Sequence, residues 1–312
     1  MTKDLTQGSP VRLILGFALP LLAGMLFQQL YNLVDTLIVG RFLGMEALAG
    51  VGATGSINFL VLGFCMGVCS GFAIPVAQQF GAREESRMRE FVANGTWLSI
   101  VFALVMTVLT VVYCGDILRV MNTPTDCFEQ AYDYIVVIFA GIPFTFLYNL
   151  LSGWLRSLGD SKTPLFFLVL SSVLNVILDL AFILIFKLGM GVRGAALATI
   201  VSQGVSCLWV VLFLFSRKSV LKLRVQNFLQ SPRLILPCVG LGTATFIMQA
   251  SESVLSVCFN SSLARYGGDI AVGAMTILTS VMQFALLPLQ GISQGAQPIL
   301  SYNYGAKNVE RV

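Results

Sequence analysis

The chain has 312 residues, of which 56% are hydrophobic and 11% are charged, and it contains no histidine. A soluble domain carries about 25% charged residues, so this composition predicts an integral membrane protein. Without histidine, the sequence excludes an imidazole base, a His-ligated zinc or haem, and a Ser-His-Asp triad.

Eight hydrophobic runs long enough to cross a bilayer follow one another along the chain. They lie near residues 13–39, 47–79, 91–114, 130–153, 164–186, 194–216, 234–262 and 271–301. The first run is longer than the core of a signal peptide and leads into Asp35 and Arg41 rather than a small-residue cleavage site, so we expect it to be retained. The predicted fold class is therefore an all-α integral membrane protein.

The 19 Lys and Arg residues are distributed unevenly between the two sides of the predicted bundle. With the N-terminus inside, 14 of them fall in cytoplasmic segments, and the outer loops hold five: Arg41, Arg119, Lys187, Arg193 and Arg265. This bias predicts a multi-pass protein of the cell membrane with a cytoplasmic N-terminus. Loops that contact anionic membrane lipids explain the pI near 8.7, which gives no reason to expect nucleic acid as a partner.

Three acidic residues fall inside the predicted spans, namely Asp35, Asp179 and Glu252, and none of the basic residues does. A carboxylate in hydrocarbon costs several kcal/mol unless it is protonated, paired or hydrated. Because no Lys or Arg is predicted within a span, the remaining counter-charges are a proton, a metal cation or a cationic ligand.

Asp35 and Asp179 are expected at one depth, roughly 8 and 11 Å from the outer ends of their spans at 1.5 Å per residue. Asn32 precedes Asp35 by three residues and Asn175 precedes Asp179 by four, so each pair shares a helix face. Thr199 in the sixth span reaches the same depth. If these helices touch, the oxygens form a cage for Na⁺, or for a proton held between carboxylates. Alternatively, the polar side chains only hydrogen-bond one helix to another.

Glu252 belongs to a polar stripe on one face of the seventh predicted helix. Its neighbours on that face are Gln249, Ser253, Ser256 and Asn260, at helical spacing. The stripe is predicted to line a cation or substrate cavity in a second lobe, with buried helix packing as the alternative.

The chain also contains an internal repeat, in which residues 14–83 align with 238–307 at an ungapped offset of 224. Glycines carry the match: Gly16 aligns with Gly240, Gly44 with Gly268, Gly67 with Gly291, Gly71 with Gly295 and Gly81 with Gly305. Six spans separate the copies, so both cross the membrane in the same direction, as in transporters built from two parallel halves. We therefore expect a six-helix lobe over 1–216, a basic cytoplasmic linker over 217–233, and an incomplete second lobe over 234–312, as in a fragment or truncated product.

Several stretches together resemble one known family. They are ALPLLAGMLFQQLYNLVDTLIVGRFLG, GFAIPVAQQFGA, WLRSLGDSKTP, LNVILDLAFI, MQASESVLSVCFNSSLARYGGDIAVGAMTI and LPLQGISQGAQPILSYNYGA. Across essentially the whole chain they resemble the multidrug and toxic compound extrusion (MATE) transporters. The chain departs from that family in lacking helices nine to twelve, and in having Ala244 where the first copy has Pro20.

The resemblance implies a MATE-like two-lobe bundle in which Asp35, Asn175 and Asp179 couple transport to H⁺ or Na⁺, and Glu252 binds a cation. It implies a secondary antiporter, not an enzyme, that exchanges an amphipathic, often cationic drug-like compound for that ion by alternating access. No cofactor is expected, and the full-length protein is expected to be a monomer. Pro20 either lets the first helix bend when Asp35 changes charge or sits passively in a membrane helix.

Two other functions compete with drug export. A flippase of the same superfamily for lipid-linked precursors needs Arg or Lys inside its cavity to hold a pyrophosphate, and the sequence places none there. An intramembrane enzyme or a passive structural protein is disfavoured, because catalytic motifs are lacking and the buried acids share one depth. Whether Cys114 pairs with Cys127 across an outer loop stays open.

Overall fold

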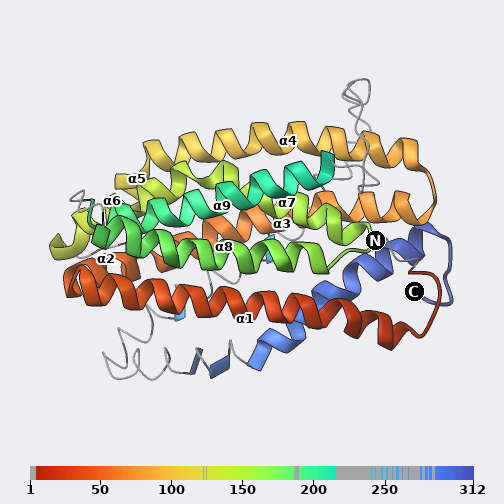
Figure 1. Ribbon diagram of the computed structural model, residues 1–312, viewed down its shortest axis with the longest axis horizontal. Coiled ribbons are helices and arrows are strands. Elements are labelled where there is room, and N and C mark those ends of the chain that lie inside the picture. Colours follow the sequence, from red (N-terminus) through yellow and green to blue (C-terminus); the bar gives the residue numbers. More distant parts are fainter. Residues whose placement is uncertain are drawn as a thin grey trace.

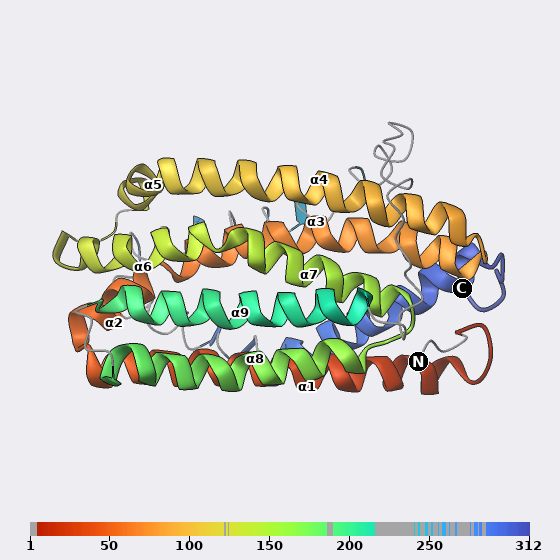
Figure 2. The same cartoon turned by 45° about the horizontal axis from the view of Figure 1, so that its top comes forward.

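The computed structural model describes residues 5–121, 123, 125–185, 190–215, scattered positions between 240 and 282, and 285–312. Every regular element in these residues is a helix, and the long helices run side by side (Figure 1). Both termini lie at one end of the bundle, which we call the termini end; α2 and α5 lie at the opposite end, the far end (Figures 1 and 2).

The described helices reproduce the first six predicted spans. They are α1 (Pro10–Phe42), α2 (Met45–Ala53), α3 (Gly55–Gly81), α4 (Glu85–Val112), α5 (Cys114–Val120), α6 (Phe128–Ala140), α7 (Ile142–Ser157), α8 (Lys162–Leu180) and α9 (Val192–Phe215), with a short turn η1 (Thr125–Cys127) before α6 and a π-helical turn η2 (Ala181–Ile185) after α8. Five of the helices are long and apolar enough to cross a membrane, and the bent pair of η1–α6 (Thr125–Ala140) and α7 passes the same test when the two are taken together. The multi-pass, all-helical prediction is therefore confirmed.

Two predicted spans are not single helices. The second run breaks at Thr54, whose hydroxyl donates to the carbonyl of Val51 (2.7 Å). The fourth run bends by 47° at Gly141. Pro143 follows two residues later, and a proline removes a helix hydrogen bond and clashes with the carbonyl four residues before it, which accounts for the bend.

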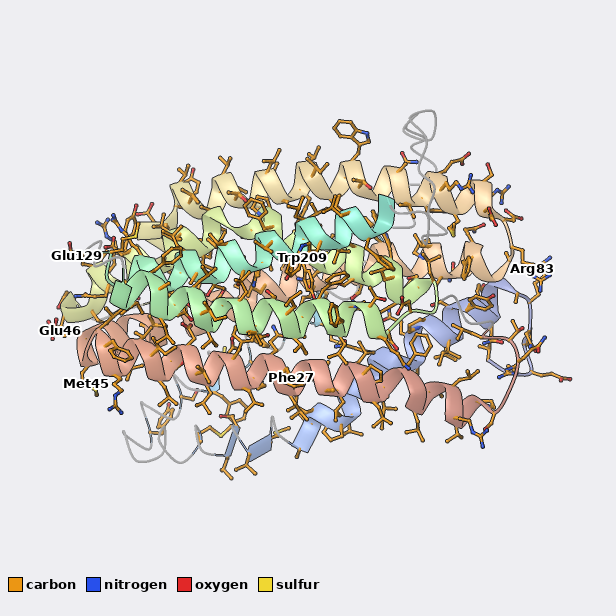
Figure 3. All side chains as sticks on the ribbon, in the orientation of Figure 1. Phe27, Met45, Glu46, Arg83, Glu129 and Trp209 are labelled. Atoms are coloured by element: carbon orange, nitrogen blue, oxygen red, sulfur yellow. The ribbon has the colours of Figure 1, made fainter. Side chains whose placement is uncertain are left out.

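The outer surface of the bundle suits a bilayer. Large apolar side chains such as Leu30, Leu104 and Val108 are more than half exposed along the middle of the helices. Charged side chains lie at the ends, with Arg83 at the termini end and Glu46 at the far end (Figure 3). Without hydrocarbon around it, such an apolar belt would be costly.

The interior of the bundle is close-packed around α7. Trp154, Phe139 and Phe146 are each about 1% exposed and belong to a core cluster that also takes in side chains of α3 and α4. This core makes α7 the central helix of the bundle. The polar face of α7 lines the cavity described below.

A helix over residues 285–305 crosses to the termini end and packs on α1 and α3 (Figure 1). Its Tyr302 ring meets Phe80 edge-on at 5.5 Å. Beyond it, the amide of Asn303 donates to the carbonyl of Leu5 (3.2 Å), and the guanidinium of Arg311 donates to the carbonyl of Gly8 (2.7 Å). The N-terminal segment is thus tied to the C-terminal one.

Two glycines allow this helix to approach α3 closely. A Cβ atom on Gly81 would lie 2.0 Å from the carbonyl oxygen of Tyr302, and a Cβ atom on Gly305 would lie 1.9 Å from that of Gln78. Backbone therefore meets backbone, at a distance that only glycine permits. We call these two approaches the glycine contact.

Several predictions concern residues outside the described ones. These are the linker over 217–233 and the second-lobe residues Gln249, Glu252, Ser253 and Ser256.

The possible disulfide between Cys114 and Cys127 is not formed in the structure, where Cys114 is a free, buried thiol.

Candidate functional site

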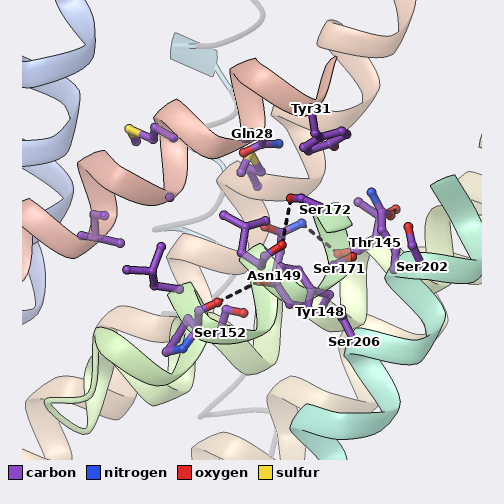
Figure 4. A pocket seen from close by; sticks show the side chains of 18 of the residues that line it. Gln28, Tyr31, Thr145, Tyr148, Asn149, Ser152, Ser171, Ser172, Ser202 and Ser206 are labelled. Carbon is purple, nitrogen blue, oxygen red and sulfur yellow. Dashed lines mark hydrogen bonds between the residues drawn. The ribbon is translucent and has the colours of Figure 1, made fainter. Parts of the chain in front are cut away.

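A cavity of about 170 Å³ with both polar and apolar lining lies between α1, α3, α7, α8 and α9, and Gln294 of the helix over 285–305 also reaches it. The side chains that line it come from the faces of these helices that point toward one another (Figure 4). Its polar lining includes Gln28, Tyr31, Thr145, Tyr148, Asn149, Ser152, Arg156, Ser161, Ser171, Ser172, Asn175, Thr199, Ser202, Gln203 and Ser206. A concave site with many polar groups is the usual form of a small-molecule site in a helical bundle.

Hydrogen bonds hold the helices around the cavity in register. Asn175 of α8 donates through its amide to the hydroxyl of Thr199 on α9 (3.2 Å). Thr145 of α7 donates to the side-chain oxygen of Gln203, also on α9. Tyr148 of α7 donates to the carbonyl of Pro164 at the start of α8 (3.2 Å). The three helices are therefore linked at both ends of the cavity.

The two first-lobe acids meet at the end of the cavity that faces the far end of the bundle. Asp35 is 8% exposed and Asp179 is 0% exposed. Their carboxyl groups are close enough to interact with each other. Each is roughly 10 Å from the far end of its helical span at 1.5 Å per residue, so they occupy the common depth that the sequence predicts.

Four buried oxygens in this cluster have no hydrogen-bond donor among the described residues. They are one carboxyl oxygen of Asp35, both carboxyl oxygens of Asp179, and the amide oxygen of Asn175. None of the recorded ion pairs includes either acid. Buried polar groups are normally satisfied, so this group of acceptors is arranged to receive a donor or a cation.

Repulsion between the two carboxylates also requires a proton or a cation at this site. Two like charges about 4 Å apart repel by about 4 kcal/mol at an effective dielectric constant of about 20. Two ionised carboxylates therefore cannot share this pocket without compensation. One proton between them, or one Na⁺ on the four oxygens, removes the repulsion.

The predicted site residues are not all brought together. Asn175 lies one turn before Asp179 on α8, and it lines the cavity together with its hydrogen-bond partner Thr199. Pro20 lines the cavity at the α1 wall within a continuous helix. Asn32 is exposed and does not line the cavity. Three residues along a helix rotate a side chain by roughly 60° from its neighbour's direction, which carries Asn32 away from the buried face that Asp35 occupies.

Sequence reasoning missed two tyrosines and a stripe on α7. Tyr31 and Tyr134 lie near both carboxyl groups. The stripe consists of Thr145, Tyr148, Asn149, Ser152 and Arg156, at positions i, i+3, i+4, i+7 and i+11. This is the spacing that identifies the stripe around Glu252, so the signal was present.

The position of Arg156 differs from the one predicted. The sequence predicts that Arg156 lies in a cytoplasmic segment, three residues beyond the fourth hydrophobic run, and that no basic side chain enters the cavity. In the structure α7 continues to Ser157, and Arg156 lines the cavity. Helix α7 extends beyond the apolar run because the glycine that terminates it is Gly159. Its φ of +87° is the left-handed conformation that follows a helix C-terminus.

Asp179 stands at a change in helix geometry. The π-helical turn η2 begins two residues after it. Such turns insert a wider ring into an α-helix and are frequent at functional sites. Nothing in the hydropathy of the fifth run indicates this turn.

A bundle of membrane-length helices around a polar cavity makes this chain a multi-pass integral membrane protein. The MatE family model matches residues 20–181 and 244–312. The chain belongs to that family, the MATE multidrug efflux transporters.

Individual relatives are similar along the whole chain. Probable multidrug resistance protein YoeA of Bacillus subtilis is 28% identical over 321 residues, which cover 100% of this chain and 68% of YoeA. Probable multidrug resistance protein YpnP of Bacillus subtilis is 30% identical over 314 residues, covering 99% of this chain and 68% of YpnP. A solved structure of a MATE family multidrug resistance transporter in an outward-facing conformation superposes with a TM-score of 0.92 at 27% identity, covering 100% of this chain and 69% of that one.

Proposed function

We propose that the protein is a secondary active antiporter of the cell membrane, which exports amphipathic, often cationic drug-like compounds in exchange for entering H⁺ or Na⁺. One observation carries the proposal: the carboxyl groups of Asp35 and Asp179 are buried against each other, and no basic residue in the described ranges is ion-paired with either. Such a pair needs a mobile positive charge. The names of the multidrug resistance relatives support export of drugs.

The position of the acids connects the ion to the substrate. Asn175 and Thr199 line the cavity, and Asn175 lies one turn before Asp179 on α8, so ion binding at the acids changes the wall that a substrate contacts. If ion and substrate favour opposite states of the bundle, each weakens binding of the other by the same factor. An entering cation also gains about 2.3 kcal/mol per 100 mV of membrane potential, which drives export.

Alternating access requires the two lobes to separate at one end while they close at the other. The glycine contact supports this motion. At the offset of 224 found in the sequence, Gly81 corresponds to Gly305, and Gln78 corresponds to Tyr302. Gly81 meets Tyr302 and Gly305 meets Gln78, so the contact is reciprocal, as two-fold-related segments make it.

The proposal assigns the termini end to the cytoplasm, in agreement with the bias of basic residues toward that side. The described structure is closed there by the glycine contact, and the similar solved structure is named outward-facing. We take the state described as the one that opens to the exterior. In the cell membrane we expect a monomer surrounded by lipid.

The test is efflux of ethidium, a permanently cationic dye, from cells without other multidrug pumps. Asp35→Asn should abolish efflux at unchanged protein level, because it removes the negative charge that binds the coupling ion. Asp116→Asn, at an exposed acid on α5, is the matched control and should export normally. Efflux that is unaffected by Asp35→Asn would refute the coupling role. Replacing external Na⁺ by choline separates the ions: efflux that stops indicates Na⁺, and efflux that continues indicates H⁺.

Arg156 favours a second candidate function. A flippase for lipid-linked precursors needs a cationic side chain in the cavity for its anionic headgroup, and Arg156 provides one. Movement of a phosphate-bearing lipid between leaflets, without ethidium export, would select this function.

A further inference from the structure

We infer that Arg156 forms an anion-binding subsite of the cavity, which binds the carboxylate or phosphate group of those exported compounds that carry one on an apolar body. The inference rests on the proposed transport function and specifies the chemistry of the substrate. Its basis is the environment of Arg156 among the described residues.

Arg156 lies in the last turn of α7 and lines the cavity, as do Ser152 and Ser161. The ionisable groups that interact with it are the Tyr148 hydroxyl and the Cys69 thiol, which carry no charge at neutral pH. The adjacent Ser157 turns away and donates to the carbonyl of Ala73 (2.8 Å). No anionic side chain of the described chain therefore compensates the Arg156 charge.

The other described arginines differ from Arg156. Arg87, Arg89, Arg119 and Arg193 each pair with a carboxylate within 4.0 Å, Arg12, Arg41 and Arg83 are exposed, and Arg311 donates to backbone carbonyls. Arg156 is only partly exposed and takes part in no ion pair within the described ranges. A charge removed from water without a partner costs several kcal/mol, and a bound anion would offset that cost.

The chemistry of the side chain defines the ligand. A guanidinium presents a planar fork of donors that matches the two oxygens of a carboxylate or phosphate. Ser152 and Ser161 also line the cavity, and their hydroxyls are further possible donors to a bound anion. A purely cationic compound would gain no such contact with Arg156.

The cavity has opposite electrostatic ends. Thr145 and Arg156 are eleven residues apart on α7, roughly 16 Å at 1.5 Å per residue. The lining also includes Asn175, one turn before Asp179 on α8, and the apolar side chains of Leu21, Met25, Leu62, Met66, Leu165 and Leu168. This arrangement fits an elongated amphiphile whose anionic group binds Arg156, with a cationic or hydrogen-bond-donating group near Asn175.

Two fluorescent probes test the subsite in the efflux assay. Norfloxacin carries a carboxylate and an ammonium group, whereas ethidium carries only positive charge. R156Q should lower norfloxacin export by at least about tenfold, since a hydrogen bond to a charged group contributes about 1.5–3 kcal/mol. It should leave ethidium export within twofold. R87Q, which removes an exposed arginine of the same end of the bundle, should change neither.

R156K tests the geometry of the charge and replaces R156Q if that variant does not reach the membrane. Lysine keeps the positive charge but loses the fork, so norfloxacin export should fall to a value between wild type and R156Q while ethidium export persists. If either variant, at normal protein level, reduces export of both probes equally, Arg156 is structural and the inference is wrong.

Binding and lipid measurements separate the sources of the anion from failure of the transport proposal. Purified protein should bind norfloxacin in an Arg156-dependent manner even if no efflux is observed in cells. In proteoliposomes, Arg156-dependent movement of fluorescent phosphatidylglycerol would identify a lipid headgroup, and Arg156-dependent norfloxacin movement would identify a free amphiphile. If binding and movement of both anionic probes are independent of Arg156, the inference is overturned.

Discussion

Replacing one glycine of the glycine contact should open the termini end of the bundle. A Cβ atom at position 305 would lie 1.9 Å from the carbonyl oxygen of Gln78, and real Cβ contacts are essentially never shorter than 3.0 Å. In Gly305→Ala the two backbones must therefore separate by at least the difference, 1.1 Å. The position of the Cβ is set by its own backbone, and the Gln78 oxygen is a backbone atom, so rotation of a side chain cannot relieve the clash. Gly81→Ala should act in the same way, because a Cβ there would lie 2.0 Å from the Tyr302 oxygen.

The expected energy is large enough to change the conformational equilibrium. Overpacking of a close contact costs about 1–3 kcal/mol, which corresponds to a change of about 5- to 150-fold in the ratio of closed to open molecules. The strain applies only to the state in which the glycine contact is closed. The state open at the termini end is therefore favoured.

Spin labels at the termini end measure this shift. Glu84 and Glu310 are exposed on either side of the contact, and cysteines there can be labelled after Cys238 and Cys258 are replaced by serine. Electron resonance distances between the labels should lengthen in Gly305→Ala and remain unchanged in Gly52→Ala, where a Cβ meets nothing within 4 Å. A folded Gly305→Ala protein with the wild-type distance distribution would refute the reasoning.

Three further predictions follow from individual contacts. Asn175→Leu removes one of the four acceptor oxygens and should raise the cation concentration for half-maximal efflux at least about tenfold; an unchanged value would exclude Asn175 from the ion site. Trp154→Ala should destabilise the fold by about 3–5 kcal/mol and lower its thermal unfolding midpoint, whereas Trp97→Ala, at a position 44% exposed, should not; equal effects would contradict the assigned core. Arg193→Gln breaks a partly exposed ion pair with Asp133 (2.6 Å), which contributes less than about 1 kcal/mol, so the midpoint and efflux should persist, and loss of either would show a larger role.

The fold was largely predictable because the bilayer imposes a helix length. Hydropathy located the first six spans, and the fixed rise per residue placed Asp35 and Asp179 at one depth. Depth does not specify which helices touch, however, so only the structure shows that the two carboxyl groups meet. The bend at Gly141 was not predicted, since an apolar run continues through it, although Pro143 is a recognised cause of such bends.

The errors in the candidate site also have physical causes. Asn32 satisfied the spacing rule, but the buried side of α1 lies toward Gln28 and Tyr31, which line the cavity. Arg156 was missed because hydropathy marks where apolar residues end rather than where the helix ends. A long basic side chain at a span terminus can extend along an apolar surface with its charged group elsewhere, so only the structure places that group in the cavity.

The most direct measurement of the central claim is ion flux during substrate export. In proteoliposomes loaded with ethidium, wild-type protein should take up H⁺, reported by a trapped pH dye, or labelled Na⁺, as ethidium leaves. Asp35→Asn and Asp179→Asn should each abolish that uptake, because the buried carboxyl pair is the ion site. Export of ethidium by wild-type protein without uptake of either ion, or ion uptake that persists in both variants, would contradict the account.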